Sequence, residues 1–127
     1  MTPKALLLVG LGGFFGANLR YVFSLIIPRV TAPAYPQIGT LFVNVVGSLL
    51  LAALLEWGGR QTALSQETRL LVATGFFGSF TTFSTFSNEV IALYQTASWQ
   101  AAFFYLFATN SLCLIAVFIG LWVGNHL

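Results

Sequence analysis

The third apolar stretch of this chain contains the run Gly75-Phe-Phe-Gly-Ser-Phe-Thr-Thr-Phe-Ser-Thr-Phe-Ser-Asn-Glu89, in which hydroxyl side chains are interleaved with phenyl rings. Polar groups at bilayer depth must find partners inside the protein. Such a run is therefore stable there only when it is buried or faces a water-filled path. We call residues 75–89 the hydroxyl block, and expect it to carry the function.

The composition of the chain is that of a membrane protein. Of its 127 residues, 57% are hydrophobic and only 6% are charged, and the mean hydropathy is +0.87. Soluble domains carry far more charge. Four apolar segments, at about residues 5–27, 38–57, 69–96 and 99–124, each have roughly the ~20 residues that span a bilayer. We therefore expect a single all-α domain over residues 1–127 with four transmembrane helices.

The connections between these segments are short, and no soluble domain fits between them. The helices themselves must therefore perform the function. The first segment follows Lys4 as a signal peptide would, but Arg20 comes after it without a small-residue cleavage pattern, and three more apolar segments follow. We expect the first segment to be retained.

The charges specify the orientation in the membrane only weakly. Basic residues near the segment ends fall on both sides of the membrane. Lys4, Arg60 and Arg69 lie on one side, and Arg29 lies on the other. Under the positive-inside rule this thin bias is compatible with one weakly encoded orientation or with both orientations. The net charge of +2 is too small to indicate a nucleic-acid partner.

Small residues line one face of the first segment. Gly12 and Gly16 recur at an interval of four and are followed at the same interval by Arg20. This face suits close helix packing. The guanidinium of Arg20 either lies in an aqueous mouth, where it attracts anions, or reaches the membrane interface.

Polar residues recur at the same interval in the second and fourth segments. The two series are Thr40, Asn44 and Ser48, and Tyr105, Thr109 and Cys113. Asn44 is the most informative member, because an amide at this depth either bonds another helix or donates to a permeant species. Two such polar tracks together indicate a pathway.

The hydroxyl block favours a break in the third helix. Gly75 and Gly78 precede side chains that compete for backbone hydrogen bonds, and a broken membrane helix exposes carbonyl and N–H groups to ions. The alternative is a continuous helix whose hydroxyls bond back to preceding carbonyls. Phe83 and Phe86 lie three residues apart and share a face, and the positive edges of their rings can hold a small anion.

The chain lacks the groups that several other functions need. Glu89 is the only acid within a span, and it lies well past the middle of its span. The one histidine, His126, is next to the C-terminus, and no catalytic triad or zinc motif is present. The single Cys113 excludes disulfides within the chain and metal sites built from cysteines. We predict that the protein is not an enzyme.

The hydroxyl block, together with Gly39-Thr-Leu-Phe-Val-Asn-Val-Val-Gly-Ser48 and Gly12-Gly-Phe-Phe-Gly-Ala-Asn-Leu-Arg-Tyr21, resembles the CrcB/Fluc family of fluoride channels from end to end. The resemblance implies a passive, fluoride-selective channel in the prokaryotic inner membrane that exports cytoplasmic fluoride and relieves its toxicity. It also implies an antiparallel, dual-topology homodimer with two pores along the subunit interface. Such a dimer would account for the weak charge bias.

The resemblance also implies roles for particular residues. Phe83 and Phe86 match the pore phenylalanines, Asn44 matches the amide donor, and Arg20 matches the basic residue near the vestibule. The remaining candidate pore residues are Thr40, Thr82, Ser84, Tyr105 and Thr109. The carbonyls of Gly78 and Thr81 match the ligands of a structural sodium ion at the dimer interface. The chain departs from the family pattern with Ser79 in place of a second glycine and Cys113 in place of a serine.

Two other functions fit parts of the sequence. A small multidrug-type, proton-coupled exporter shares the length and the four helices but needs a deep carboxylate, for which Glu89 is poorly placed. A non-conducting scaffold fits the face of Gly12 and Gly16, but it leaves the hydroxyl block unexplained.

Overall fold

The computed structural model describes residues 2–60 and 64–127. In this part of the chain, four helical segments are long and apolar enough to cross a membrane, namely Pro3–Thr31, Gln37–Arg60, Gln66–Thr96 and Trp99–His126. The prediction of an all-helical protein with four membrane segments is confirmed. The segments extend a few residues beyond most of the predicted ends because the helices continue past the apolar core of each span.

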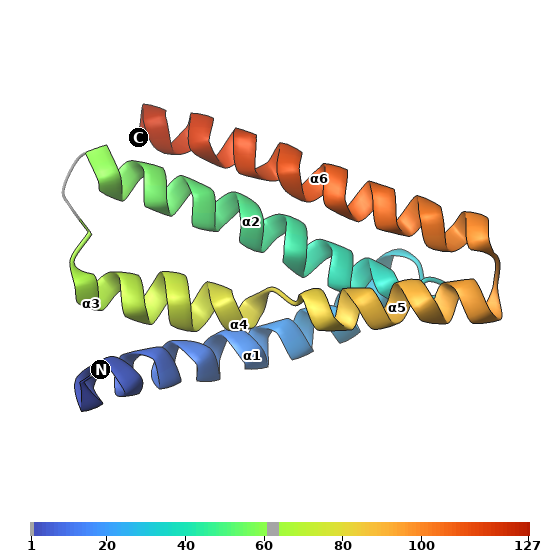
Figure 1. Ribbon diagram of the computed structural model, residues 1–127, viewed down its shortest axis with the longest axis horizontal. Coiled ribbons are helices and arrows are strands. Elements are labelled where there is room, and N and C mark those ends of the chain that lie inside the picture. Colours follow the sequence, from blue (N-terminus) through green and yellow to red (C-terminus); the bar gives the residue numbers. More distant parts are fainter. Residues whose placement is uncertain (1, 61–63) are drawn as a thin grey trace.

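Three of the segments are single helices (Figure 1). They are α1 (Pro3–Thr31), α2 (Gln37–Arg60) and α6 (Trp99–His126). The third segment is made of α3 (Gln66–Thr68), the π-helix η1 (Arg69–Phe77), α4 (Gly78–Phe80) and α5 (Phe83–Thr96). Helix α2 packs along α6, α1 packs along η1, and α5 reaches across to α6. Both ends of the chain lie at the same end of the bundle in Figure 1.

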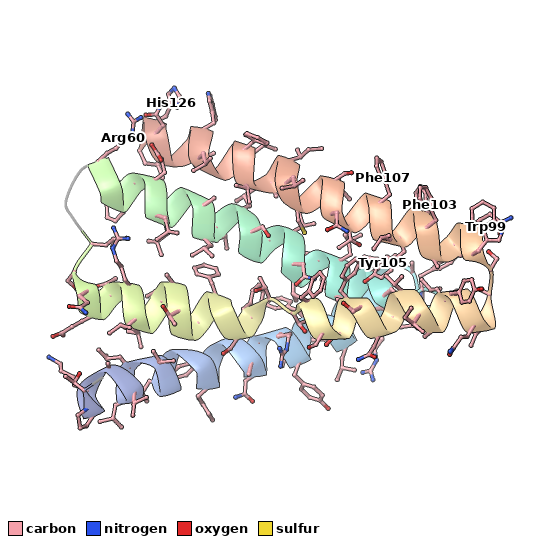
Figure 2. All side chains as sticks on the ribbon, in the orientation of Figure 1. Arg60, Trp99, Phe103, Tyr105, Phe107 and His126 are labelled. Carbon is pink, nitrogen blue, oxygen red and sulfur yellow. The ribbon has the colours of Figure 1, made fainter. Side chains whose placement is uncertain are left out.

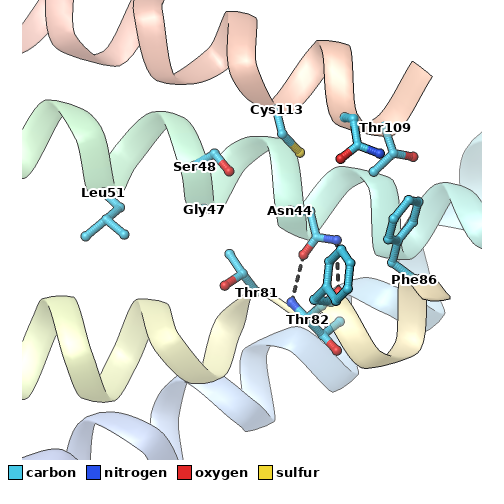
Figure 3. Close-up of a pocket in the computed structure, with 11 residues that line it drawn as sticks. Asn44, Gly47, Ser48, Leu51, Thr81, Thr82, Phe86, Thr109 and Cys113 are labelled. Carbon is cyan, nitrogen blue, oxygen red and sulfur yellow. Dashed lines mark hydrogen bonds between the residues drawn. The ribbon is translucent and has the colours of Figure 1, made fainter. Parts of the chain in front are cut away.

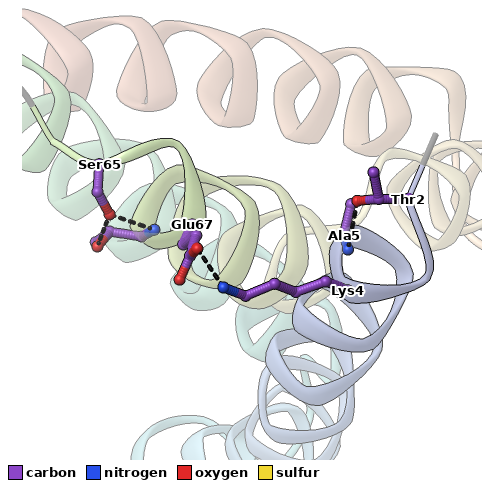
Figure 4. Close-up of polar contacts among 6 residues, drawn as sticks. Thr2, Lys4, Ala5, Ser65 and Glu67 are labelled. Atoms are coloured by element: carbon purple, nitrogen blue, oxygen red, sulfur yellow. Dashed lines mark hydrogen bonds and ion pairs between the residues drawn. The ribbon is translucent and has the colours of Figure 1, made fainter.

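Side-chain hydroxyls and one ion pair fix the start of the helices. The Thr2 hydroxyl accepts a hydrogen bond from the Ala5 amide and caps α1, and the Ser65 hydroxyl caps α3 through the Thr68 amide. Lys4 forms an ion pair with Glu67 between α1 and α3 (Figure 4). Because both charges are exposed, we expect this pair to add little stability.

The seam between α1 and η1 is formed by backbone atoms. Gly12 and Gly16 are buried. A Cβ added at Gly12 would lie 1.9 Å from the carbonyl oxygen of Leu71, and one at Gly16 would lie 2.1 Å from that of Phe76. Only glycine therefore allows this approach, and the small face that the sequence shows is used for packing.

A second seam of this kind joins α2 to α6. A Cβ at Gly120 would lie 2.3 Å from the carbonyl oxygen of Leu49, and one at Gly124 would lie 2.4 Å from that of Ala53. The sequence analysis did not single out this pair, although its spacing of four is the same signal. The outer face of α6 carries large apolar side chains. Figure 2 shows Phe103 and Phe107 pointing away from the bundle, as expected of a lipid-facing surface.

Two extended residues separate α4 from α5 inside the hydroxyl block. Thr81 has φ −86° and ψ 158°, and Thr82 has φ −151° and ψ 115°. Neither pair of angles is helical. The backbone groups near this point must therefore find partners other than those of a regular helix.

Candidate functional site

A groove of about 250 Å³ lies between α2, α6 and the extended residues (Figure 3). It brings together six of the residues to which the resemblance gave a role, namely Asn44, Thr81, Thr82, Phe83, Phe86 and Thr109. Ser48, Asn110 and Cys113 also line it, and none of the lining residues carries a formal charge. The groove is thus uncharged, with a few polar groups among mostly apolar surface, and it lies within the membrane-spanning part of the chain.

Asn44 holds the extended part of the third segment. Its Nδ2 donates to the carbonyl oxygen of Thr82 at 3.1 Å, and its Oδ1 accepts from the Thr82 amide at 2.7 Å. Only 9% of Asn44 is exposed. The amide thus makes the bond between helices that was one of its two predicted roles. A primary amide has two N–H groups, so one donor remains for another partner.

Two backbone carbonyls near the same point lack their usual helical donors. The Thr82 amide donates to Asn44, and the Thr85 amide donates to the Thr82 hydroxyl, which caps α5. In a continuous helix these two amides would bond the carbonyls of Gly78 and Thr81. Carbonyl oxygens released in this way are the ligands that unwound membrane helices offer to sodium. The chemistry of the two groups therefore fits the predicted sodium ligands.

The two candidate phenylalanines lie in different environments. Phe86 is buried, with 3% of its surface exposed, whereas Phe83 is 75% exposed. Their ring centroids are 5.7 Å apart, and the ring of Phe86 also lies 5.4 Å from that of Tyr105. Phe86 therefore forms part of the floor of the groove, and Phe83 forms part of its open edge.

A carboxylate cluster lies next to the groove, where α2, α5 and α6 meet. Thr40 Oγ1 donates to Glu89 Oε1 at 2.8 Å, and the Tyr105 hydroxyl donates to Glu89 Oε2 at 2.7 Å. Thr40 and Tyr105, which were predicted to line the pore, thus bind a carboxylate beside the groove rather than line the groove itself. The sequence analysis left Glu89 out of the site. The signal available was that the only acid within a span has hydroxyl tracks on two other helices as potential partners.

Three further candidates lie outside the groove. Arg20 is half-buried on α1, Ser84 is exposed near the start of α5, and Gly78 is exposed at the start of α4. The Ser84 hydroxyl lies 3.3 Å from that of Thr82. The structure therefore does not bring Arg20 to the other site residues, and it places Ser84 and Gly78 at the outer surface of the chain.

Thr109 has an unsatisfied hydroxyl. Only 3% of the residue is exposed, and its Oγ1 has no hydrogen-bond partner within residues 2–60 and 64–127. Buried polar groups are nearly always hydrogen-bonded, so an orphan of this kind indicates a partner from outside the chain. Thr109 lines the groove, but its Oγ1 is itself buried, one helical turn from Tyr105, and is not exposed to the groove.

Comparison with known proteins gives consistent matches over most of the chain. A family profile described as CrcB-like protein, Camphor Resistance (CrcB), matches residues 7–121. The fluoride-specific ion channel FluC of Chelativorans sp. (strain BNC1) is 40% identical over 122 residues, which are 96% of this chain and 97% of the relative. The proteins of the same name from Shewanella sediminis (strain HAW-EB3) and Shewanella sp. (strain ANA-3) are 41% and 42% identical over 115 residues, which are 91% of each chain.

Proposed function

Because this chain belongs to the CrcB family, we propose that it is a fluoride-selective, passive ion channel that exports cytoplasmic fluoride and relieves its toxicity. Its relatives and its four membrane spans make it a multi-pass bacterial membrane protein and not an enzyme. The observation that carries the proposal is the uncharged polar groove, in which an amide, hydroxyls and phenyl rings meet inside the membrane.

The donors in the groove suit a small, strongly hydrated anion. Fluoride enters such a path only if several water hydrogen bonds are replaced at once. The second N–H of Asn44 and the positive edges of the Phe83 and Phe86 rings are available for this, and the buried Thr109 hydroxyl would join them after a rotation of its side chain. No carboxylate lines the groove, so no formal negative charge in its lining repels an anion.

Export requires no coupling to an energy source. Undissociated HF crosses bilayers and loses its proton in a near-neutral cytoplasm, which traps fluoride inside. An interior-negative potential is worth about 2.3 kcal/mol per charge per 100 mV. This potential is enough to drive the anion out through a passive path.

The open side of the groove supports an antiparallel homodimer. Polar groups in a groove that opens toward lipid are unfavourable, and the open edge of this groove is formed by Phe83, which is 75% exposed. We propose that a second copy in the opposite orientation covers this side and that the dimer contains two pores. The thin bias of basic residues between the two sides, which does not enforce one orientation, is compatible with this arrangement.

We also propose that Thr81 and Thr82 form the functional break in the third helix. In this proposal the carbonyls of Gly78 and Thr81 hold a structural sodium ion at the dimer interface. When bound, the cation would compensate the partial negative charge of carbonyl oxygens that lack helical donors. Gly78 is exposed in the single chain, as an interface ligand must be before the dimer forms.

Ion flux through the purified protein tests the proposed function. The protein is reconstituted in liposomes loaded with fluoride or with chloride, and efflux is followed with an ion-selective electrode after valinomycin removes the potential. We expect fast fluoride efflux without chloride efflux. Proton-coupled uptake of organic cations would instead support a small multidrug-type exporter. No flux of any kind from a well-folded protein would support a scaffold.

A further inference from the structure

We propose that Asn110 on α6 is a second amide donor of the anion path, and that the permeating anion is held between the amides of Asn44 and Asn110. This inference deepens the proposed function and rests on it. The pore residues predicted from the sequence do not include Asn110.

Asn110 brings a polar side chain to the groove near the centre of the membrane. By helical rise it lies about 4 Å from the middle of α6, and the residue is exposed. It lines the same groove as Asn44, which comes from the other wall, on α2. Lipid offers no hydrogen-bond partner at this depth, so the groove is where the amide can find one.

The hydrogen bonds of the two amides leave a free donor on each. Asn110 Nδ2 donates to the carbonyl oxygen of Leu106, in its own helix, at 2.7 Å. A primary amide has two N–H groups, so a second N–H of Asn110 remains, as one does on Asn44. Two N–H donors from different helices thus share a groove of about 250 Å³.

Asn18 shows that exposure and local geometry alone do not single out Asn110. It is also exposed, it lies close to the middle of α1, and its Nδ2 donates to the Phe14 carbonyl oxygen of its own helix at 2.6 Å. Helix α1, however, contributes no residue to the lining of the groove. Asn110 therefore differs from Asn18 in facing a path that also holds a second amide.

The other donors of the lining are weaker or already in use. The hydroxyls of Thr81 and Thr82 donate to groups of the chain itself. A hydroxyl has a single O–H donor, and the thiol of Cys113 is a weak one. The N–H groups of Asn44 and Asn110 are therefore the donors best able to form strong hydrogen bonds with an anion.

The test measures fluoride efflux from liposomes at a series of internal fluoride concentrations. This series gives a maximal rate and a half-saturating concentration for the wild type, Asn110→Ala and Asn110→Asp. Asn18→Ala and Asn18→Asp are the matched controls. Equal amounts of folded protein are used, the oligomeric state of each variant is measured by size-exclusion chromatography, and efflux is repeated from mildly acidic to mildly alkaline pH.

We expect Asn110→Ala to raise the half-saturating fluoride concentration roughly tenfold, since it removes a hydrogen bond to a charged species. In Asn110→Asp, efflux should fall as the pH rises, because the ionised carboxylate repels the anion. Cys113 in the lining and Glu89 beside the groove also titrate, but they are present in every variant and form a common background. Both Asn18 variants should match the wild type.

Three results would overturn the inference while leaving the proposed function in place. One is a lower maximal rate of Asn110→Ala with an unchanged half-saturating concentration, which indicates a structural role. Another is loss of the dimer with the same unchanged concentration, which indicates a contact with the second copy. The third is an equal effect of the Asn18 variants. If the wild type itself shows no fluoride efflux, the proposed function fails, and this inference fails with it.

Discussion

The two halves of the third membrane segment are held in opposite ways. Helix η1 packs on α1 through backbone carbonyls that touch Gly12 and Gly16, and no side chain separates them. Helix α5 is held by side chains: Thr82 caps it, and Glu89 binds hydroxyls from α2 and α6. The first half should therefore be sensitive to added atoms, and the second half to removed polar groups.

The largest expected effect comes from adding one methyl group to the seam of the first half. In Gly12→Ala the new Cβ would lie 1.9 Å from the Leu71 carbonyl oxygen, and that atom belongs to the backbone and cannot rotate away. We expect a loss of about 3 kcal/mol in unfolding free energy, at the upper end of the cost of overpacking. Reversible unfolding in detergent measures it.

Gly10→Ala is the matched control for this prediction. It adds the same methyl group to the same helix, but no atom of a neighbouring helix lies within 4 Å of the new Cβ. We expect no loss of stability from it, because alanine also favours the helix over glycine. Equal destabilisation by both variants would show that the backbone seam does not hold η1.

The next largest effect should come from removing a side chain at the junction of the two halves. Asn44→Ala leaves both the amide and the carbonyl of Thr82 without their partner. We expect a loss of about 2 kcal/mol, since each buried unpartnered group costs about 1–3 kcal/mol and water in the groove can replace part of the loss. Fluoride efflux should fall as well. Unfolding and efflux are measured on the same preparation.

Asn18→Ala controls for the loss of an amide as such. Asn18 is exposed, and its Nδ2 donates only to the Phe14 carbonyl oxygen of its own helix. We expect almost no change in stability. A loss as large as that of Asn44→Ala would mean that the contact with Thr82 does not stabilise the junction.

The four spans and part of the groove could be predicted from the sequence, because hydropathy and residue spacing are local properties. Four apolar runs gave the four spans, and intervals of four placed Asn44 and Thr109 on helix faces that do line one groove. The pairing of Asn44 with Thr82 joins residues 38 positions apart, and nothing local encodes it. The same holds for Glu89, since its neighbours depend on how α2 and α6 cross α5.

The π-helical form of η1 was also beyond the sequence analysis. Residues 69–77 have the composition of an ordinary apolar helix, and the wider turn arises where the segment packs on the glycines of α1. The Gly120 and Gly124 seam could have been read from its spacing. The different environments of Phe83 and Phe86 could not, because a shared helix face does not determine which residue is covered.

In the second half, loss of a hydroxyl that donates to Glu89 should cost more stability than the partial exposure of Glu89 suggests. Tyr105→Phe removes the donor to Glu89 Oε2 and keeps the ring that packs against Phe86. We expect a loss of about 1.5 kcal/mol, typical of a hydrogen bond to a charged group. Thr40→Val removes the other donor, so a double-mutant cycle should show coupling between the two. Additive losses would mean that the two hydroxyls do not share one carboxylate.

The smallest loss of stability should come from removing the cap of α5. This change tests most directly whether the second half of the segment is held by side chains. Thr82→Ala removes the hydroxyl that accepts from the Thr85 amide at 3.3 Å, while the backbone bonds of Thr82 to Asn44 remain. We expect a loss of about 1 kcal/mol, the usual cost of losing an N-cap. Thr82→Ser keeps the hydroxyl and should retain most of the stability. Hydrogen exchange at the Thr85 amide separates this cap from the junction itself, because only the alanine variant should lose protection there. If that amide stays protected in Thr82→Ala, the start of α5 is fixed by Asn44 alone, and both halves of the segment then depend on contacts to the backbone.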